Sequence, residues 1–143
     1  GLTPNEQYTH ISLWCLLDAP LLIGCDMTKL DSFTLGLLTN DEVLAVNQDA
    51  LGKQAARVLK TGPGGMIEVW AKNMADGSKA VGIFNRSELQ QPYTLKPADI
   101  GLSGEQTVRD LWRQKDVATT DASFTAPIPR HGVVLLRITP SKR

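Results

Sequence analysis

The sequence predicts a mixed fold, in which a helix–strand–helix segment precedes an antiparallel β-sandwich. An apolar run, 19–26, lies between two stretches with helical spacing, 3–18 and 31–47. From about residue 51 the apolar residues alternate at period two instead. Turn-forming Gly, Pro, Asn and Asp residues then divide the chain into short segments. We therefore expect a boundary that separates residues 1–51 from residues 52–143.

The first helix is expected over residues 3–18. Thr3 and Glu6 have the spacing of a capping box, and Pro4 occupies the first helical position. Apolar residues then cover a broad face, so the helix needs packing partners on most sides. Pro20 disfavours a helical conformation at the residue before it and ends the segment.

The apolar run at 20–26 reads as a strand buried on both faces, which is typical of a parallel sheet. We see no second strand of this kind in the chain. A second helical stretch follows over 31–47, with Asp31 or Ser32 as its cap and a break with a fresh cap at 39–42. This first segment therefore lacks the neighbours that its apolar faces require.

The period-two alternation in residues 52–143 predicts an antiparallel sandwich. Asp76-Gly77 is a hairpin signal between two alternating segments. Short strands at close spacing are typical of β-sandwiches. The expected strands are 54–60, 66–72, 79–85, 92–96, 106–112, 122–126 and 132–139.

Composition excludes several classes of function. Lys plus Arg and Asp plus Glu are both 15, so the balance gives no reason to expect nucleic acid or an anionic membrane as partner. No apolar stretch approaches the roughly 20 residues of a membrane span. The first residues have neither the basic nor the apolar region of a signal peptide, and none is expected in this chain.

Metal and cofactor sites are not expected either. The chain has two cysteines and two histidines, and their spacing matches no zinc pattern. Cys15 and Cys25 are interpreted as small buried hydrophobes. A disulfide between them stays open, because it depends on the distance and direction of the two Cβ atoms.

Several stretches together resemble the C-terminal third of the α-galactosidases of glycoside hydrolase family 27, the melibiases. The resemblance is carried, in order, by residues 1–7, 12–14, 19–26, 46–49, 51–54, 69–72, 75–78 and 80–86. It implies that 3–18, 20–26 and 31–47 are the seventh helix, eighth strand and eighth helical region of a (β/α)8 barrel. Residues 52–143 would then form the C-terminal, Greek-key type sandwich.

The resemblance also implies a chemistry. Members of this family are retaining exo-glycosidases that release terminal α-linked galactose with two aspartates. By the resemblance, both aspartates lie upstream of Gly1, so no catalytic residue is assigned here and the chain alone is expected to be inactive. The parent protein is expected to be secreted or periplasmic, to act on galactose-containing oligosaccharides and to need no cofactor.

Two alternatives stay open. The parent could be an α-N-acetylgalactosaminidase or a β-L-arabinopyranosidase, because the loops that select the sugar lie upstream. The sandwich could instead be a non-catalytic module that binds carbohydrate or braces the barrel. The apolar residues of 8–38 further imply that the fragment self-associates or pairs with the missing N-terminal part.

Few residues are candidates for a binding site. Asp26 ends the presumed barrel strand, where it is either a rim residue of the active site or a loop cap. Trp70 and Trp112, expected in strands, are either platforms for a sugar or core residues. His10 and His131 are interpreted as structural, and Asn85-Arg86-Ser87 is a glycosylation sequon.

Overall fold

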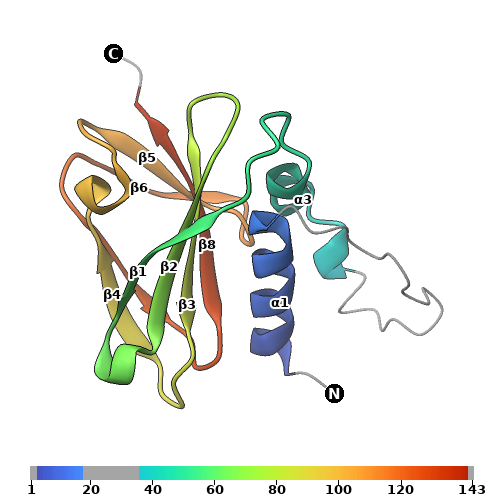
Figure 1. Ribbon diagram of the computed structural model, residues 1–143, viewed down its shortest axis with the longest axis vertical. Coiled ribbons are helices and arrows are strands. Elements are labelled where there is room, and N and C mark those ends of the chain that lie inside the picture. Colours follow the sequence, from blue (N-terminus) through green and yellow to red (C-terminus); the bar gives the residue numbers. More distant parts are fainter. Residues whose placement is uncertain (1–2, 18–35, 142–143) are drawn as a thin grey trace.

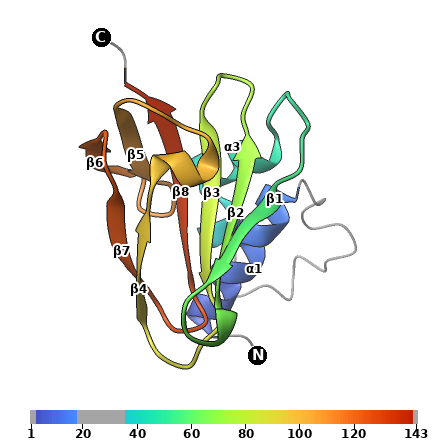
Figure 2. The same cartoon turned by 60° about the vertical axis from the view of Figure 1, so that its left-hand side comes forward.

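The computed structural model describes residues 3–17 and 36–141, which form three layers. A six-stranded sheet, in the order β1-β2-β3-β8-β5-β6, is the middle layer, and a two-stranded sheet, β4-β7, covers one of its faces. Helices α1 and α3 lie against the opposite face (Figures 1 and 2). All strand pairs in the two sheets are antiparallel.

The regular elements follow the chain in the order helices, then strands. The helices are α1 (Pro4–Leu16) and α3 (Asp41–Asn47), with short 3-10 turns η2 (Pro63–Gly65) and η3 (Pro97–Ile100) inside the sandwich. The strands are β1 (Ala56–Thr61), β2 (Ile67–Asn73), β3 (Lys79–Asn85), β4 (Gln91–Leu95), β5 (Gln106–Asp110), β6 (Lys115–Thr120), β7 (Phe124–Ile128) and β8 (Val133–Pro140).

The predicted helix signals are confirmed where the structure describes them. Thr3 caps α1, its Oγ1 accepts from the Glu6 amide, and the Glu6 carboxylate accepts from the Thr3 amide. That bond from Thr3 holds the pKa of Glu6 below its usual value. Asn40 provides the fresh cap expected at 39–42, with Oδ1 accepting from Glu42 and Val43 amides. The antiparallel sandwich is confirmed as well.

Two expectations about strands are wrong. The strand β6 was not anticipated, because residues 115–120 are mostly polar and this edge strand has only one paired neighbour. The strand expected at 106–112 ends at Asp110, and Trp112 lies in the turn that follows. The expected strand 20–26, the caps Asp31 and Ser32, and Cys25 lie outside the described residues.

Both faces of the six-stranded sheet are buried. Leu16 and Cys15 of α1 and Val43 and Val46 of α3 are fully buried in one cluster with Leu135 of β8 and its neighbours. A second cluster fills the space between the two sheets, with members including Ile67, Val69, Ile83, Leu136 and Ile128. Alternation along the strands therefore sends apolar residues to both sides, as a sheet covered on both faces requires.

Gly82 sets how closely α1 approaches the sheet. A Cβ atom at this position would lie 2.6 Å from Leu16 Cδ1 and 2.6 Å from Phe84 Cε1. Gly82 lies in β3, opposite Trp70 of β2 and Leu135 of β8. The missing side chain thus leaves the space that the end of Leu16 occupies.

Main-chain and side-chain hydrogen bonds also tie the helical layer to the sandwich. The Leu16 carbonyl accepts from the amide of Ala55, just before β1. Lys72, which is 1% exposed, donates to the carbonyl of Val46 in α3. A lysine buried this deeply requires such acceptors, so α3 has a defined position over β2.

Asn85 of the sequon is a structural residue. It is 2% exposed, and its Nδ2 donates to the carbonyls of Leu89 (2.8 Å) and Ile128 (3.1 Å). Its Oδ1 accepts from the amide (2.9 Å) and the Oγ (2.7 Å) of Ser87. The side chain thereby joins the end of β3 to the loop before β4 and to β7.

We predict that Gly82→Ala destabilises the fold by about 1–3 kcal/mol, because the new methyl group has no space beside Leu16. Urea unfolding followed by far-ultraviolet circular dichroism measures this loss. Gly36→Ala is the matched control, since a Cβ there would meet nothing within 4 Å. Equal stability of the wild type and the Gly82→Ala variant would contradict the proposed close approach.

We also predict that the folded chain carries no glycan at Asn85. Attachment consumes a hydrogen on the Nδ2 that serves the carbonyls of Leu89 and of the buried Ile128, and the 2% exposure of Asn85 leaves no room for a sugar. Mass spectrometry of the soluble, monodisperse product from a secreting eukaryotic host measures the occupancy. As a control, Ala75→Ser creates a sequon at the exposed Asn73, where a glycan is expected. A well-folded product with a glycan on Asn85 would disprove the assignment.

Candidate functional site

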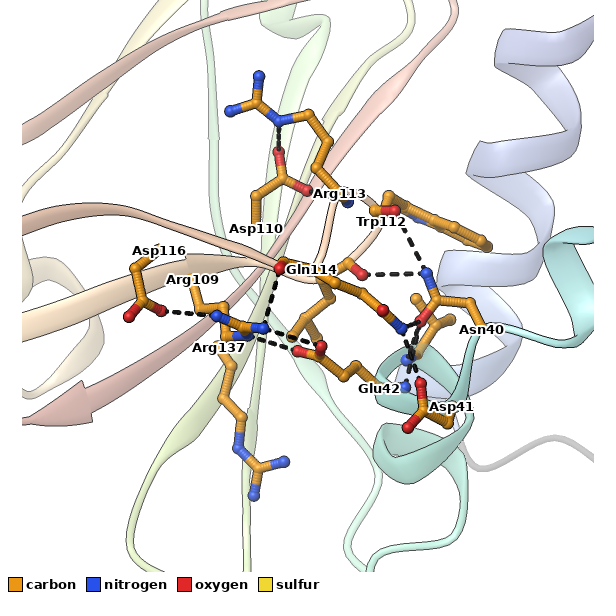
Figure 3. Close-up of polar contacts among 12 residues, drawn as sticks. Asn40, Asp41, Glu42, Arg109, Asp110, Trp112, Arg113, Gln114, Asp116 and Arg137 are labelled. Carbon is orange, nitrogen blue, oxygen red and sulfur yellow. Dashed lines mark hydrogen bonds and ion pairs between the residues drawn. The ribbon is translucent and has the colours of Figure 1, made fainter.

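A network of charged and amide side chains joins α3 to the β5–β6 hairpin (Figure 3). Arg109 of β5 forms a fork with Glu42 of α3, with Nε–Oε1 at 2.6 Å and Nη2–Oε2 at 3.0 Å. The same guanidinium reaches Asp116 of β6 at 3.0 Å. Hydrogen bonds to Glu42 and Asp116 raise the pKa of Arg109 above its already high usual value. The arginine therefore holds a helix and two strands in one arrangement.

The cap of α3 takes part in the same network. Asn40 Nδ2 donates to the carbonyls of Leu111 (3.0 Å) and Trp112 (3.3 Å), in the turn between β5 and β6. From the other side, Gln114 Nε2 donates to Asn40 Oδ1 (3.0 Å) and to Asp41 Oδ1 (2.7 Å). Gln114 has a φ of 52°, a conformation uncommon for a residue with a side chain. The start of α3 and this turn thus position each other.

Trp112 connects the turn to α1. Its indole Nε1 donates to Ser12 Oγ at 2.8 Å, and Ser12 is fully buried. The rings of Trp112 and Tyr8 form a T-shaped pair, with centroids 4.9 Å apart and planes at 80°. The expectation that Trp112 sits in a strand is thus wrong, but its ring is fixed between the helical layer and the sandwich.

A groove of about 460 Å³ opens beside this aromatic pair. Tyr8 and Asn5 of α1 line one side, and residues of β7 and β8 line the other. Asp110 and Arg113 lie at the β5–β6 turn, and their Oδ2 and Nε atoms are 3.1 Å apart. The lining combines aromatic rings, prolines, aliphatic side chains and one pair of opposite charges. Such a mixture is typical of a small-molecule pocket.

Trp70 has a different environment. Its Nε1 donates to Glu68 Oε1 at 3.2 Å, and its ring packs against the helix-side core. Partial burial would raise the pKa of Glu68, but hydrogen bonds from Trp70 and Arg86 outweigh it and hold the pKa below its usual value. Trp70 does not line the groove. Of the two tryptophans interpreted as either sugar platforms or core residues, only Trp112 therefore borders this space.

The remaining sequence candidates do not form a catalytic group. Asp26 lies outside the described residues. His10 is exposed on α1, with its ring 6.3 Å from that of Trp14. His131 lies in the turn before β8 and contacts Glu88 through Nε2 at 3.0 Å. Within 3–17 and 36–141, no three His, Cys, Asp or Glu side chains are placed to hold a metal ion.

Retaining glycoside hydrolysis requires two carboxyl groups about 5–5.5 Å apart on either side of the glycosidic bond. The groove is lined by a single carboxylate, Asp110, which is paired with Arg113. Two other pockets, of about 500 and 280 Å³, contain one carboxylate each, Asp121 and Asp99. None of these three spaces therefore has the pair that this chemistry needs.

Sequence reasoning missed the network around Arg109. Its partner Glu42 is 67 residues away in the chain, and Gln114 is 74 residues from Asn40. No motif spacing reports contacts at such separations. The available local signal was the cap at Asn40, which was predicted, although its second role as a donor to the β5–β6 turn was not.

No helix among the described residues combines the length and apolar character needed to cross a membrane. α1, at 13 residues, is longer than α3, at 7 residues.

Comparisons with known proteins agree with the fold. A family model described as the α-galactosidase C-terminal β-sandwich domain matches residues 64–138, and a model described as α-galactosidase A matches residues 1–49. The α-galactosidase of Cyamopsis tetragonoloba is 39% identical over 98% of this chain and 34% of its own length. α-Galactosidase 2 of Arabidopsis thaliana is 38% identical over 99% of this chain and 36% of its own length.

Solved structures show the same likeness. α-Galactosidase I from Mortierella vinacea superposes with a TM-score of 0.88 at 30% identity, over 99% of this chain and 38% of that one. A family 27 β-L-arabinopyranosidase from Geobacillus stearothermophilus superposes with a TM-score of 0.87 at 31% identity, over 98% of this chain and 31% of that one. The chain spans about a third of the length of the curated relatives it matches. It therefore belongs to the α-galactosidases of glycoside hydrolase family 27, in which it corresponds to the C-terminal part with the β-sandwich.

Proposed function

We propose that this chain is the bracing part of an enzyme that hydrolyses terminal α-linked galactose with retention of configuration. The curated relatives quoted above are named α-galactosidases, and they match nearly the whole chain. The arabinopyranosidase neighbour, at 31% identity, is as similar to this chain as the Mortierella α-galactosidase, at 30%, and keeps the alternative sugar open. The names of the curated relatives support galactose as the first sugar to test for the parent enzyme.

In this chemistry, one carboxylate attacks the anomeric carbon and displaces the leaving group. The second carboxyl group protonates the leaving oxygen and then activates a water molecule that hydrolyses the glycosyl-enzyme. The three pockets described above hold single carboxylates only. This observation supports the proposal that the 143-residue chain has no hydrolytic activity of its own.

The bracing role rests on how the helices are held. α1 and α3 bury apolar side chains against β2, β3 and β8. The Arg109–Glu42 fork and the Asn40 bonds add direction to this contact. We propose that residues 1–51 belong to the barrel of the parent enzyme and residues 52–143 to the sandwich. The observation that carries the proposal is the Arg109–Glu42 fork, which joins the two parts.

An exposed side chain on the outer side of α1 supports the proposal of a further partner. Trp14 is 44% exposed on this helix, away from the buried Cys15 and Leu16. Single exposed apolar side chains are common on protein surfaces, so the proposal rests on the match of residues 1–49 to the α-galactosidase A model as well. We propose that the chain pairs with the N-terminal part of the parent barrel or, without it, with itself. We further propose that the parent enzyme is secreted or periplasmic.

We predict no turnover of a chromogenic α-galactoside by the purified chain, because it lacks the two catalytic carboxylates. Joined to the N-terminal two thirds of the Cyamopsis enzyme, the same chain should restore turnover. Activity that co-elutes with the isolated chain, or a soluble, well-folded chimera without activity, would contradict the proposal. The intact Cyamopsis enzyme is the positive control.

We predict that Glu42 and Arg109 are energetically coupled. A double-mutant cycle with Glu42→Gln and Arg109→Gln, read by urea unfolding, should give a favourable coupling free energy that decreases with salt, since both groups are partly exposed. The control cycle, Glu88→Gln with Arg130→Gln, joins two side chains that are 72% and 60% exposed and should give about zero. Equal coupling in the two cycles would argue against a bracing role for Arg109.

A further inference from the structure

We propose that the groove beside Trp112 is a non-catalytic binding site for a neutral pyranoside. The site lies in the part of the chain that the structure describes, and it uses none of the hydrolytic chemistry of the parent enzyme. The choice of a galactoside as the first ligand to test rests on the proposed function. The existence of the groove does not depend on it.

Aromatic, proline and aliphatic side chains form the walls, the aliphatic ones being Val117, Ala126, Val133, Val134 and Leu135. Tyr8 of α1 and Trp112 of the turn lie on one side, and Phe124, Pro127 and Pro129 lie on the other. The C–H faces of a pyranose carry partial positive charge and pack well on the electron-rich faces of aromatic rings. A volume of about 460 Å³ falls within the range of small-ligand sites.

The polar groups of the groove favour a neutral ligand. Asp110 and Arg113 neutralise each other at 3.1 Å, so the groove has no excess charge to attract an anion. Arg113 is 61% exposed and keeps donors available, while Asp110 supplies acceptors. Hydroxyl groups both donate and accept, and a polyhydroxyl ring therefore suits this pair better than a phosphate or a carboxylate.

The edge of β7 also disfavours an extended peptide. Pairing between β5 and β8 ends at Asp110 and Leu136, so the groove opens beside the first residues of β8. Antiparallel alternation directs the main-chain groups of Val133 toward that side. Across the groove, Pro127 of β7 has no amide hydrogen to donate. A peptide strand could not form a regular ladder with β7, whereas a sugar needs no such ladder.

The aromatic walls are held in place without a ligand. The indole N–H of Trp112 is occupied by Ser12, and Tyr8 forms a T-shaped pair with the Trp112 ring. Binding would then cost little ordering of these two side chains. Trp70, the other tryptophan for which platform and core were both open, lies outside the groove and provides an internal control.

The test is a titration of the isotope-labelled 143-residue chain with methyl α-galactopyranoside, followed by two-dimensional NMR. We expect saturable shifts of the Trp112 indole signal and of β7 amides, with a dissociation constant of about 1 mM. The indole signals of Trp14 and Trp70 should not move. Arg113→Ala should weaken binding about tenfold, because it removes charged donors.

Arg86→Ala is the matched control. Arg86 is 59% exposed and pairs with Glu68 at 3.0 Å, much as Arg113 pairs with Asp110, but it lies outside the groove. This variant should bind like the wild type. Absence of saturable shifts at about ten times the expected dissociation constant would overturn the proposal. So would equal weakening by both variants, or tighter binding of a proline-rich peptide or inorganic phosphate at the same residues.

Discussion

Burial of both faces of one antiparallel sheet is the constraint on which the rest of this structure depends. Antiparallel sheets commonly leave one face to solvent, but here a pair of strands covers one face and two helices cover the other. The strands β2, β3 and β8 therefore carry apolar residues in both directions. The helices are as necessary to the sheet as the second sheet is, and the absent side chain of Gly82 shows how tightly α1 is fitted.

Apolar burial alone would not select one placement of α3 on the sheet, since it has little directional preference. The polar network supplies the direction. Arg109 binds Glu42 through two nitrogen–oxygen contacts, and Asn40 caps α3 while it donates to the adjacent turn. Buried Lys72 adds a donor to the α3 carbonyl of Val46. Each of these contacts is lost if the helix shifts by one turn, so the network fixes the register between the layers.

Local signals in the sequence predicted local features well. The capping box at Thr3, the cap at Asn40 and the Asp76-Gly77 hairpin were all visible, because each depends on residues within a few positions. The edge strand β6 was missed because a strand with one neighbour tolerates polar residues and lacks a clear alternation. The groove and the Arg109 network could not be predicted, since both join residues that are distant in the chain.

The position of β8 has a consequence for how the chain reaches its native state. The strand nearest the C-terminus lies between β3 and β5, in the interior of the main sheet. Until residues 133–140 are available, the three strands β1–β3 and the hairpin β5–β6 are separate units with exposed edges. During synthesis on a ribosome the sheet can close only late, and such non-local pairing slows folding. Loss of residues 133–140 would thus remove an interior strand and divide the sheet in two, rather than remove an edge strand.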